Sequence, residues 1–335
     1  MIGRRTFLAG TGTVLLTAPL AAEAQQTKVY RVGFLFHGSP PPPGEIGSPL
    51  ILTNVVLTNT LRELGYIEGR NIVIDRRWAD SKMERFPILA AELVALKPDV
   101  LVATSTPGGL AAQRATATIP VVLAEVSDPV GTGLVASLAR PGGNITGVTD
   151  FGIELAAKEL DVLHVLFPKA TRFAVLMSDN PVHPFQLRAV EDAARAIGLS
   201  ITSERVTSLE ELDGAFASMA KSNVGAFILF GGPPFTSDAS VAKIISLAAK
   251  TKLPGMYPNR FRVERGGLLS YGPNRSHIWG RAAIYVDRIL KGANPGDLPM
   301  EQPREFELVI NLKTAKALGL TIPPSLLGRA DEVIQ

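Results

Sequence analysis

Residues 98–125 read PDVLVATSTPGGLAAQRATATIPVVLAE and contain a complete strand–helix–strand unit. The apolar runs at 98–103 and 120–125 predict two buried strands, and residues 108–117 between them predict a helix. Pro107 suits the first position of that helix, because proline has no N–H to donate and its φ is already helical. Two strands joined by a helix lie parallel in one sheet that is covered on both faces. The stretch therefore predicts an α/β fold.

Strands and helices alternate in the same way along both halves of the chain. The first half adds expected strands at 29–36 and 71–78 and expected helices at 51–64 and 84–96. The second half repeats the scheme, with expected strands at 171–177, 199–206, 224–230 and 253–257 and expected helices at 185–197, 209–221 and 238–250. This alternation predicts two doubly wound lobes with parallel sheets, and the length of 335 residues fits two domains better than one.

Two similar glycine-rich stretches follow the fourth strand of each half. They are residues 142–149 (GGNITGVT) and residues 266–272 (GGLLSYG). We interpret both as extended segments that leave one lobe for the other, and hence as hinge candidates. Two ordinary Gly-Gly turns before edge strands would give the same pattern. A helix at 274–290 would return to the first lobe, and a strand at 303–310 would run toward the second. The expected lobes comprise residues 28–148 with 272–301, and residues 149–271 with 302–335.

Residues 1–24 differ from the rest of the chain and are typical of an export signal. Arg4-Arg5 supplies a positive start, an apolar run follows from Phe7 to Leu20, and Ala22-Glu23-Ala24 has the small-x-small form that signal peptidases cleave. The arginine pair is typical of the twin-arginine route, but Gly3 before it leaves the Sec route open. An N-terminal membrane anchor is the alternative. Because glycine and proline interrupt the apolar run, we expect a periplasmic protein without stable membrane insertion.

Composition excludes several classes of protein. The chain has no cysteine, which excludes disulfides, thiolate metal sites and cysteine nucleophiles. Removing residues 1–24 takes away two arginines and one glutamate, which leaves 32 basic and 30 acidic residues. The excess of basic residues is small, and the basic residues do not cluster in one run. We therefore expect no nucleic-acid partner.

The familiar enzyme motifs are also missing. The sequence has no dinucleotide-binding glycine pattern, no phosphate loop and no Gly-x-Ser-x-Gly elbow. The four histidines, His37, His164, His183 and His277, share no spacing that would place two on one helix face as metal ligands. We therefore expect neither an enzyme, nor a metal site, nor a cofactor.

Candidate ligand-binding residues lie where parallel strands end, because α/β sheets bind ligands beyond the carboxyl ends of their strands. In the first half these residues are Phe36 and His37, then Ser105 and Thr106, then Asp128. The Ser105 and Thr106 hydroxyls and the helix start would hold a carboxylate, although Thr106 also suits a plain N-cap. Asp128 would face an ammonium group, or it would cap the following helix.

The second half offers matching loops. Its candidates are Asn180 and Phe185 after the first strand, Phe235 after the third, Tyr257 at the end of the fourth, and Tyr271 in the second glycine-rich stretch. Each aromatic residue alone suits the core, but together they favour a cleft that accepts an apolar or aromatic group.

Several longer stretches resemble one known family. They are Tyr30–Leu35 (YRVGFL), Leu61–Asn71 (LRELGYIEGRN), Ile119–Val122 (IPVV), Ser127–Val130 (SDPV), Leu138–Gly147 (LARPGGNITG) and Gly266–Gly272. They resemble the ABC-transporter substrate-binding proteins whose members include tryptophan- and tyrosine-binding forms. The resemblance covers residues 28–335 and implies the type I periplasmic-binding fold, with a membrane permease and its ATPase as partners. The proline-rich loop from Gly38 to Pro49 departs from the family pattern.

Together these features predict capture without turnover. Two lobes would close over an amino acid or related carboxylate, held by Ser105, Thr106 and Asp128 on one side and by Asn180 and Phe235 on the other. We expect a monomer that delivers this ligand to the permease. A sensing module that passes closure to a signalling receptor is the alternative, and an exported α/β hydrolase is less favoured because the serine elbow is missing.

Overall fold

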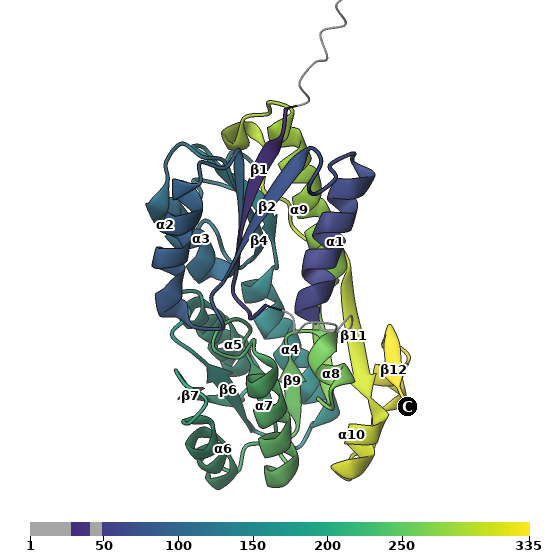
Figure 1. Cartoon of the computed structure of the whole chain (residues 1–335). Helices are drawn as coiled ribbons and strands as arrows, with labels where there is room; N and C mark the ends of the chain where they lie inside the picture. The colour runs from purple at the N-terminus through teal and green to yellow at the C-terminus, as the bar shows by residue number, and fades with distance from the viewer. Residues whose placement is uncertain (1–27, 41–48) are drawn as a thin grey trace, which may run out of the picture.

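The first lobe contains a five-stranded parallel sheet (Figure 1). The computed structural model describes residues 28–40 and 49–335. The strands lie in the order β2 (Ile72–Trp78), β1 (Tyr30–Phe36), β3 (Val100–Thr104), β4 (Val121–Val126) and β5 (Ile145–Thr149). Alternate residues of each strand point to opposite faces of the sheet, so both faces are apolar and both must be covered.

Helices cover both faces of this sheet. On one face, α1 (Pro49–Glu63) and α9 (Arg275–Leu290) pack on Val32 and Phe34 of β1. On the other face, Leu35 and Leu101 contact α2 (Phe86–Ala95), which follows the short helix η1 (Met83–Arg85), and α3 (Ser105–Ala115). The expected helix at 274–290 therefore forms, and it lies on the first sheet although it is late in the chain.

The second lobe contains a seven-stranded sheet. Its strands lie in the order β12 (Glu332–Ile334), β11 (Phe306–Asn311), β10 (Leu269–Pro273), β9 (Gly255–Tyr257), β8 (Phe227–Leu229), β6 (Arg172–Met177) and β7 (Ser200–Arg205). All neighbours are parallel except β10 and β11, which are antiparallel. The antiparallel pair departs from the purely parallel sheet that the sequence predicts, because β11 enters this lobe directly from the other one.

The second sheet is likewise sandwiched between helices. Phe173 and Val175 of β6 face α4 (Gly152–Leu166) and α5 (His183–Ala196), whereas Leu176 faces α6 (Leu212–Lys221) and α7 (Asp238–Thr251). The remaining short elements are α8 (Arg260–Glu264), η2 (Pro295–Asp297), α10 (Leu312–Ala317) and α11 (Pro324–Leu327). Two apolar clusters flank each sheet, so each lobe has its own core.

Three segments connect the lobes, and two of them are hydrogen-bonded to each other. The chain passes from β5 into α4, from β10 into α9, and through Glu301 into β11. The Glu301 N–H donates to the Gly147 carbonyl at 2.9 Å, and the Thr149 N–H donates to the Glu301 carbonyl at 2.9 Å. Arg281 on α9 holds the Glu301 carboxylate through both oxygens, at 2.8 and 2.9 Å. Beyond this paired region, Phe151 has φ 62°, a left-handed conformation that is rare for an aromatic residue.

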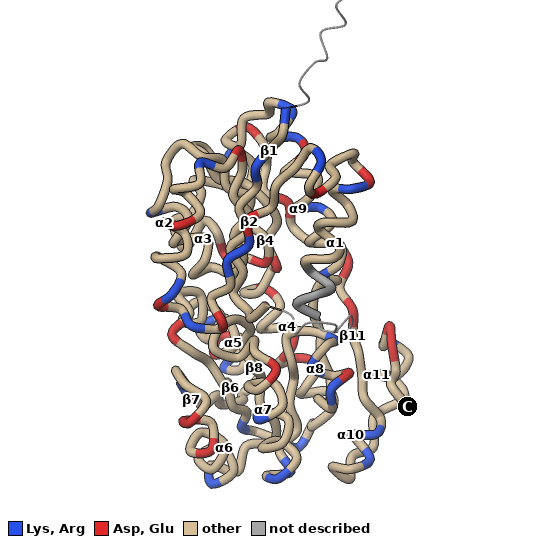
Figure 2. The backbone as a smooth tube through the Cα atoms, viewed as in Figure 1, with Lys and Arg blue, Asp and Glu red and all other residues tan. Residues whose placement is uncertain are grey.

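Some sequence expectations need correction and others lie outside the described residues. Helix α3 begins at Ser105 rather than 108, so Pro107 is its third residue. The helix ranges expected from the sequence do not include α4, which has fifteen residues. The export signal at 1–24 lies outside the described residues, as does most of the proline-rich loop. Among the helices of the described ranges, none has the length and apolarity to cross a bilayer. Figure 2 shows basic and acidic residues interspersed over both lobes.

Candidate ligand-binding site

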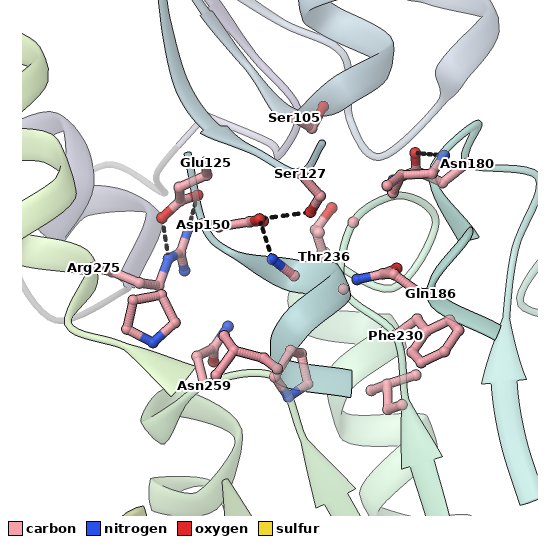
Figure 3. A pocket seen from close by; sticks show the side chains of 18 of the residues that line it. Ser105, Glu125, Ser127, Asp150, Asn180, Gln186, Phe230, Thr236, Asn259 and Arg275 are labelled. Atoms are coloured by element: carbon pink, nitrogen blue, oxygen red, sulfur yellow. Dashed lines mark hydrogen bonds and ion pairs between the residues drawn. The ribbon is translucent and has the colours of Figure 1, made fainter. Parts of the chain in front are cut away.

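A cavity of about 130 Å³ lies between the two lobes (Figure 3). This volume is roughly ten times what one buried water needs. The ends of β1, β3 and β4 supply one wall, with His37, Ser105 and Ser127. Helix α9 adds Arg275 and Ile278 to this wall, and the second lobe contributes from α4, α5, β10 and the loops after β6, β8 and β9. The cavity therefore lies at the carboxyl ends of the parallel strands, where α/β sheets place ligands.

Ser105 begins α3 at the top of the cavity. Its φ of 63° lies in the left-handed region, which costs free energy for a residue other than glycine and is common at functional sites. Its Oγ is buried and has no hydrogen-bond partner within the described ranges. The neighbouring Thr106 hydroxyl donates to the Ser127 carbonyl at 3.3 Å. A hydroxyl at a helix start with no partner of its own is suited to an anionic or polar ligand group.

Asp150 lies at the crossing between β5 and α4. Its Oδ1 accepts from the Ser127 hydroxyl at 2.6 Å and from the Gly152 N–H at 3.0 Å, as Figure 3 shows. Burial raises the pKa of Asp150 to about 6, and these hydrogen bonds oppose that rise. A Cβ on Gly152 would lie 2.5 Å from the Ser127 Oγ and 2.7 Å from the Gln186 Nε2. Only glycine fits there without displacing these two side chains.

Glu125 faces the cavity because β4 carries a bulge at this residue. The register of β4 against β5 shifts between Ala124 and Val126, and Glu125 itself has φ 57°. Its carboxylate accepts from Arg275 Nη2 at 2.6 Å and from Trp279 Nε1 at 3.0 Å. Burial alone would raise the pKa of Glu125, but the charge and hydrogen bonds of Arg275 hold it below its usual value. The charges of Glu125 and Arg275 therefore balance each other.

His37 is neutral at the edge of this ion pair. Its Nδ1 lies 2.8 Å from the Thr104 Oγ1, and the Thr104 Oγ1 also accepts from the His37 N–H at 3.0 Å. Burial lowers the pKa of His37 to about 4. This side chain is a neutral polar group at physiological pH.

Arg262 is the second cation at the cavity, and it forms no ion pair with any acidic residue that the structure describes. It is 4% exposed, and its Nη2 donates to the Phe235 carbonyl at 2.7 Å. Its Nε has no hydrogen-bond partner in the described part of the chain. Burial and the nearby Arg275 lower the pKa of Arg262 to about 9, so its positive charge persists at neutral pH. The Oδ1 of Asn259, the residue just before α8, is also buried without a partner among the described residues.

His183 holds two loops of the second lobe in place. Its Nδ1 accepts from the Ser178 N–H at 2.9 Å, so its Nε2 carries the proton and donates to the Gly231 carbonyl at 2.9 Å. The loop after β6 carries Asn180 and the loop after β8 carries Gly231, and both line the cavity. This histidine therefore fixes the shape of the second wall.

Five of the ten residues predicted from the sequence line this cavity: His37, Ser105, Thr106, Asn180 and Tyr271. The other five do not. Phe36 is 1% exposed and stacks on Trp78 with ring centroids 4.1 Å apart, because it shares the strand face of Val32 and Phe34. The side chains of Phe235 and Tyr257 are buried in the core between the second sheet and α6 and α7.

The remaining two predicted residues lie outside the cavity for different reasons. Phe185 is on an outer face of α5 and is 43% exposed. The Asp128 Oδ1 accepts from the Gly131 N–H at 2.8 Å, so its carboxylate closes a turn rather than facing a ligand. Asp150, between β5 and α4, is an acidic residue that does line the cavity.

Five further polar residues of the lining are not indicated by the sequence patterns above: Glu125, Asp150, Gln186, Arg262 and Arg275. Asp150 directly follows the first glycine-rich stretch, and Arg275 lies three residues after the second. The two stretches could therefore have been used to find these two residues, because a segment that connects the lobes also borders the space between them. No sequence pattern distinguishes Glu125, Gln186 and Arg262. Glu125 faces the cavity because of a strand bulge, and the other two face it because of how their helices pack.

Two lobes with central parallel sheets and a cavity between them define the class of type I periplasmic binding proteins. The chain belongs to the ABC transporter substrate binding protein family, whose family model matches residues 50–334. The resemblance stated from the sequence is thus confirmed.

Relatives of known identity agree with this assignment. The chain is 31% identical over 263 residues to the tyrosine-binding protein of Clostridioides difficile (strain R20291), which covers 78% of this chain and 74% of that protein. It is 28% identical to the ABC domain in complex with L-Trp from Streptococcus pneumoniae, with a TM-score of 0.83 that covers 92% of this chain and 100% of the other. A ligand-free, open structure of a substrate-binding protein from Clostridium difficile is 26% identical, with a TM-score of 0.64 over 92% of this chain and 100% of the other.

Proposed function

We propose that this protein is the periplasmic component of an ABC importer and captures an amino acid between its lobes. The observation that carries the proposal is the charge pattern of the cavity. Asp150 and Arg262 both line it, and within the described ranges neither forms an ion pair with another side chain. The charges of Glu125 and Arg275 balance each other, and burial raises the pKa of Glu159, the third acidic residue of the lining, well above its usual value, which disfavours its ionised form. One carboxylate and one guanidinium thus remain for a ligand that carries both charges, as an α-amino acid does.

Each charged group of the ligand has a suitable partner. The ligand ammonium would pair with Asp150, whose second carboxylate oxygen is not used by Ser127 or Gly152. The ligand carboxylate would pair with Arg262 through its free Nε, and the Ser105 hydroxyl at the start of α3 would add a donor. Buried ion pairs are favourable only when both partners are present, so an uncharged analogue would be rejected.

The remaining lining favours an aromatic or large apolar side chain. Phe230, Phe261 and Tyr271 line the cavity together with Leu155 and Leu229. Such walls with a few placed polar groups are typical of small-molecule clefts. The named relatives bind tyrosine and tryptophan, which supports an aromatic amino acid as the ligand.

Capture would proceed by closure of the lobes about the crossing segments. The arrangement of the lobes is closer to the L-Trp complex, with a TM-score of 0.83, than to the ligand-free open structure, with 0.64, at nearly equal identity. This difference supports a closed form that the ligand would stabilise. Membership of the family supports a membrane permease and its ATPase as partners. Closure of the lobes would change the surface that the protein presents, so the permease could distinguish loaded from empty protein.

The test identifies the ligand directly. Freshly purified protein is denatured, and the released small molecules are identified by mass spectrometry. In parallel, the twenty amino acids, simple sugars and aromatic acids are screened by thermal shift, where a ligand at 100 times its Kd adds about 2.7 kcal/mol of stability. We expect one or a few amino acids in both assays. The proposal fails if nothing is released and no amino acid raises Tm.

Asp150→Asn and Arg262→Met identify the site in the same screen. Each removes one charge from the cavity, so each should abolish most of the shift. Asp128→Asn is the matched control, because the Asp128 carboxylate is engaged by Gly131 outside the cavity. Equal shifts in all three variants would exclude the cavity as the binding site.

A further inference from the structure

A second cavity, of about 330 Å³, lies within the second lobe between α7 and α10. Figure 1 shows these two helices at the end of this lobe that lies away from the first lobe. The C-terminal half of α7, the helix α10 and the β9 residues Gly255 and Tyr257 supply most of its walls. Among the described residues, none lines both this cavity and the one between the lobes. We call the second cavity the basal cavity.

The basal cavity has a buried apolar floor and an exposed rim. Leu253, Tyr257 and Leu268 line it and are at most 5% exposed, and we define them as the floor. Ala249 on α7 and Ala317 on α10 line it and are exposed, so they lie at the rim. Protein cores leave few voids of this size, whereas pockets of about 300 Å³ or more with apolar walls are typical of small-molecule sites. The floor therefore suits the apolar body of a small ligand.

The rim carries positive charge. Lys313 is exposed and is the one charged side chain among the described residues of the lining. Lys250 and Lys316 lie on the same two helices, and within the described ranges none of these three lysines forms an ion pair. Helix α10 contains no acidic residue, and Asp238, the acidic residue of α7, lies in its first turn and pairs with Arg265 at 2.5 Å. Figure 2 shows basic residues, in blue, on α10. The rim therefore favours an anionic ligand group.

The carbonyl groups of the lining offer little to a cation. The carbonyls of Ala248 and Ala249, near the end of α7, accept from backbone N–H groups at 2.9 and 3.2 Å. The Gly266 carbonyl accepts from the Thr314 hydroxyl at 2.9 Å. An ammonium group would thus compete with existing hydrogen bonds and lie beside Lys313, whereas a carboxylate would gain a charged donor.

We propose that the basal cavity binds a small amphipathic carboxylate, whose apolar body lies on the floor and whose carboxylate pairs with Lys313 at the rim. Each buried CH₂ group raises affinity about fourfold, whereas an exposed ion pair adds about fivefold at most. The apolar body therefore supplies most of the affinity, and Lys313 selects the head group. This inference goes beyond amino-acid capture and does not depend on it, because the two cavities have separate linings.

Methyl NMR titration with octanoate, 1-octanol, octylamine and butyrate tests this inference on protein labelled at alanine, isoleucine and leucine methyl groups. The first three probes share a chain and differ in the head group, and butyrate keeps the carboxylate but lacks half of the chain. We expect octanoate to shift the methyl signals of Leu253, Leu268 and Ala317. It should bind about threefold more tightly than 1-octanol or octylamine, and at least tenfold more tightly than butyrate.

Two variants with matched controls locate the site. Ala317→Leu fills the rim at an exposed position and should weaken octanoate binding at least fivefold. Its control is Ala242→Leu, because Ala242 is exposed on α7 and does not line the cavity. Lys313→Met should remove the preference for octanoate over 1-octanol. Its control is Lys316→Met, which removes an exposed lysine of the same helix outside the lining.

The titration can overturn the inference in several ways. Octanoate that shifts Leu155 and Ile278, which line the cavity between the lobes, and leaves the floor residues unshifted would place the ligand elsewhere. Equal binding of the three head groups, or tightest binding of octylamine, would contradict selection by Lys313. The same octanoate affinity in Ala317→Leu as in the unmodified protein would also overturn the inference. The head-group series on the unmodified protein remains decisive even if a variant does not fold.

Discussion

The Ser81 Oγ lies 2.6 Å from the Thr236 Oγ1, although the two residues are 155 positions apart. Ser81 follows β2 of the first lobe, and Thr236 follows β8 of the second and lines the cavity. Ser81 has φ 61°, and its neighbour Asp80 has φ 54°, so two residues in succession adopt the left-handed conformation. The N–H groups of Asp80 and Ser81 donate to the carbonyls of Gly38 and His37 at 2.9 and 2.8 Å. A strained loop tied to a cavity residue thus makes a direct contact between the lobes.

Ser81→Ala should weaken ligand binding, although Ser81 is not one of the residues that line the cavity. This hydrogen bond joins the two lobes, so opening of the lobes would break it, and its loss should destabilise the proposed closed form by about 0.5–1.5 kcal/mol, or roughly two- to twelvefold in affinity. Most of the change should be a faster dissociation rate. Stopped-flow measurements check this prediction, with Ser203→Ala on the exposed side of β7 as control. An unchanged dissociation rate would show that the contact contributes nothing to closure.

Ligand affinity should fall below about pH 6. Because burial raises the pKa of Asp150 to about 6, its carboxyl becomes protonated below that pH and loses its attraction for an ammonium group. Binding favours the ionised form, so affinity is level above pH 7 and falls toward tenfold per pH unit below pH 6. Calorimetry from pH 5 to 8 measures the profile. Asp150→Asn should flatten it, and a variant profile as steep as that of the unmodified protein would assign the titration to another group.

Gly152→Ala should weaken ligand binding while the fold persists. The added Cβ would displace the Ser127 and Gln186 side chains and so disturb the groups around Asp150. We expect at least a tenfold loss of affinity. Gly214→Ala in α6 is the control, because a Cβ there meets open space, and it should stabilise the protein by about 0.5–1 kcal/mol. Thermal melting and calorimetry of the two variants check both statements. Normal affinity in Gly152→Ala would contradict the geometry of the α4 start.

Arg275→Met should destabilise the protein itself. It leaves the Glu125 carboxylate, whose side chain is 10% exposed, without its cation. Breaking a buried pair in this way costs about 3 kcal/mol, whereas exposed pairs contribute about 1 kcal/mol or less. Arg195→Met removes the exposed pair with Asp192 on α5 and serves as the comparison. Urea unfolding measures both. Equal losses for the two variants would mean that the Glu125–Arg275 pair is not effectively desolvated.

The alternation of apolar strands and helices was enough to predict the two parallel-sheet lobes, because buried strands such as β3 and β4 read as continuous apolar runs. The carboxyl ends of those strands placed His37, Ser105 and Asn180 at the cavity. The aromatic predictions were less successful. Phe36 and Tyr257 end strands as expected, but their strand positions direct them into the cores.

The charged part of the site depends on features that no local pattern encodes. Glu125 faces the cavity through a β4 bulge, and Asp150 lies where one lobe passes into the other. Arg262 and Glu159 are on helices, where a charged residue usually faces solvent, and only the packing of the second lobe buries them. The antiparallel β10–β11 pair likewise follows from the third crossing rather than from the strand sequences.

The most direct test of the central claim compares ligands that lack one charge each. Calorimetry with tyrosine, N-acetyltyrosine, tyrosinamide and tyramine separates the ammonium from the carboxylate. If Asp150 and Arg262 hold the two ends of an amino acid, only tyrosine binds well, and each analogue that lacks a charge loses at least about 100-fold, since a buried charge left without its partner costs about 3 kcal/mol. Equal affinities for tyrosine and its three analogues would contradict the account.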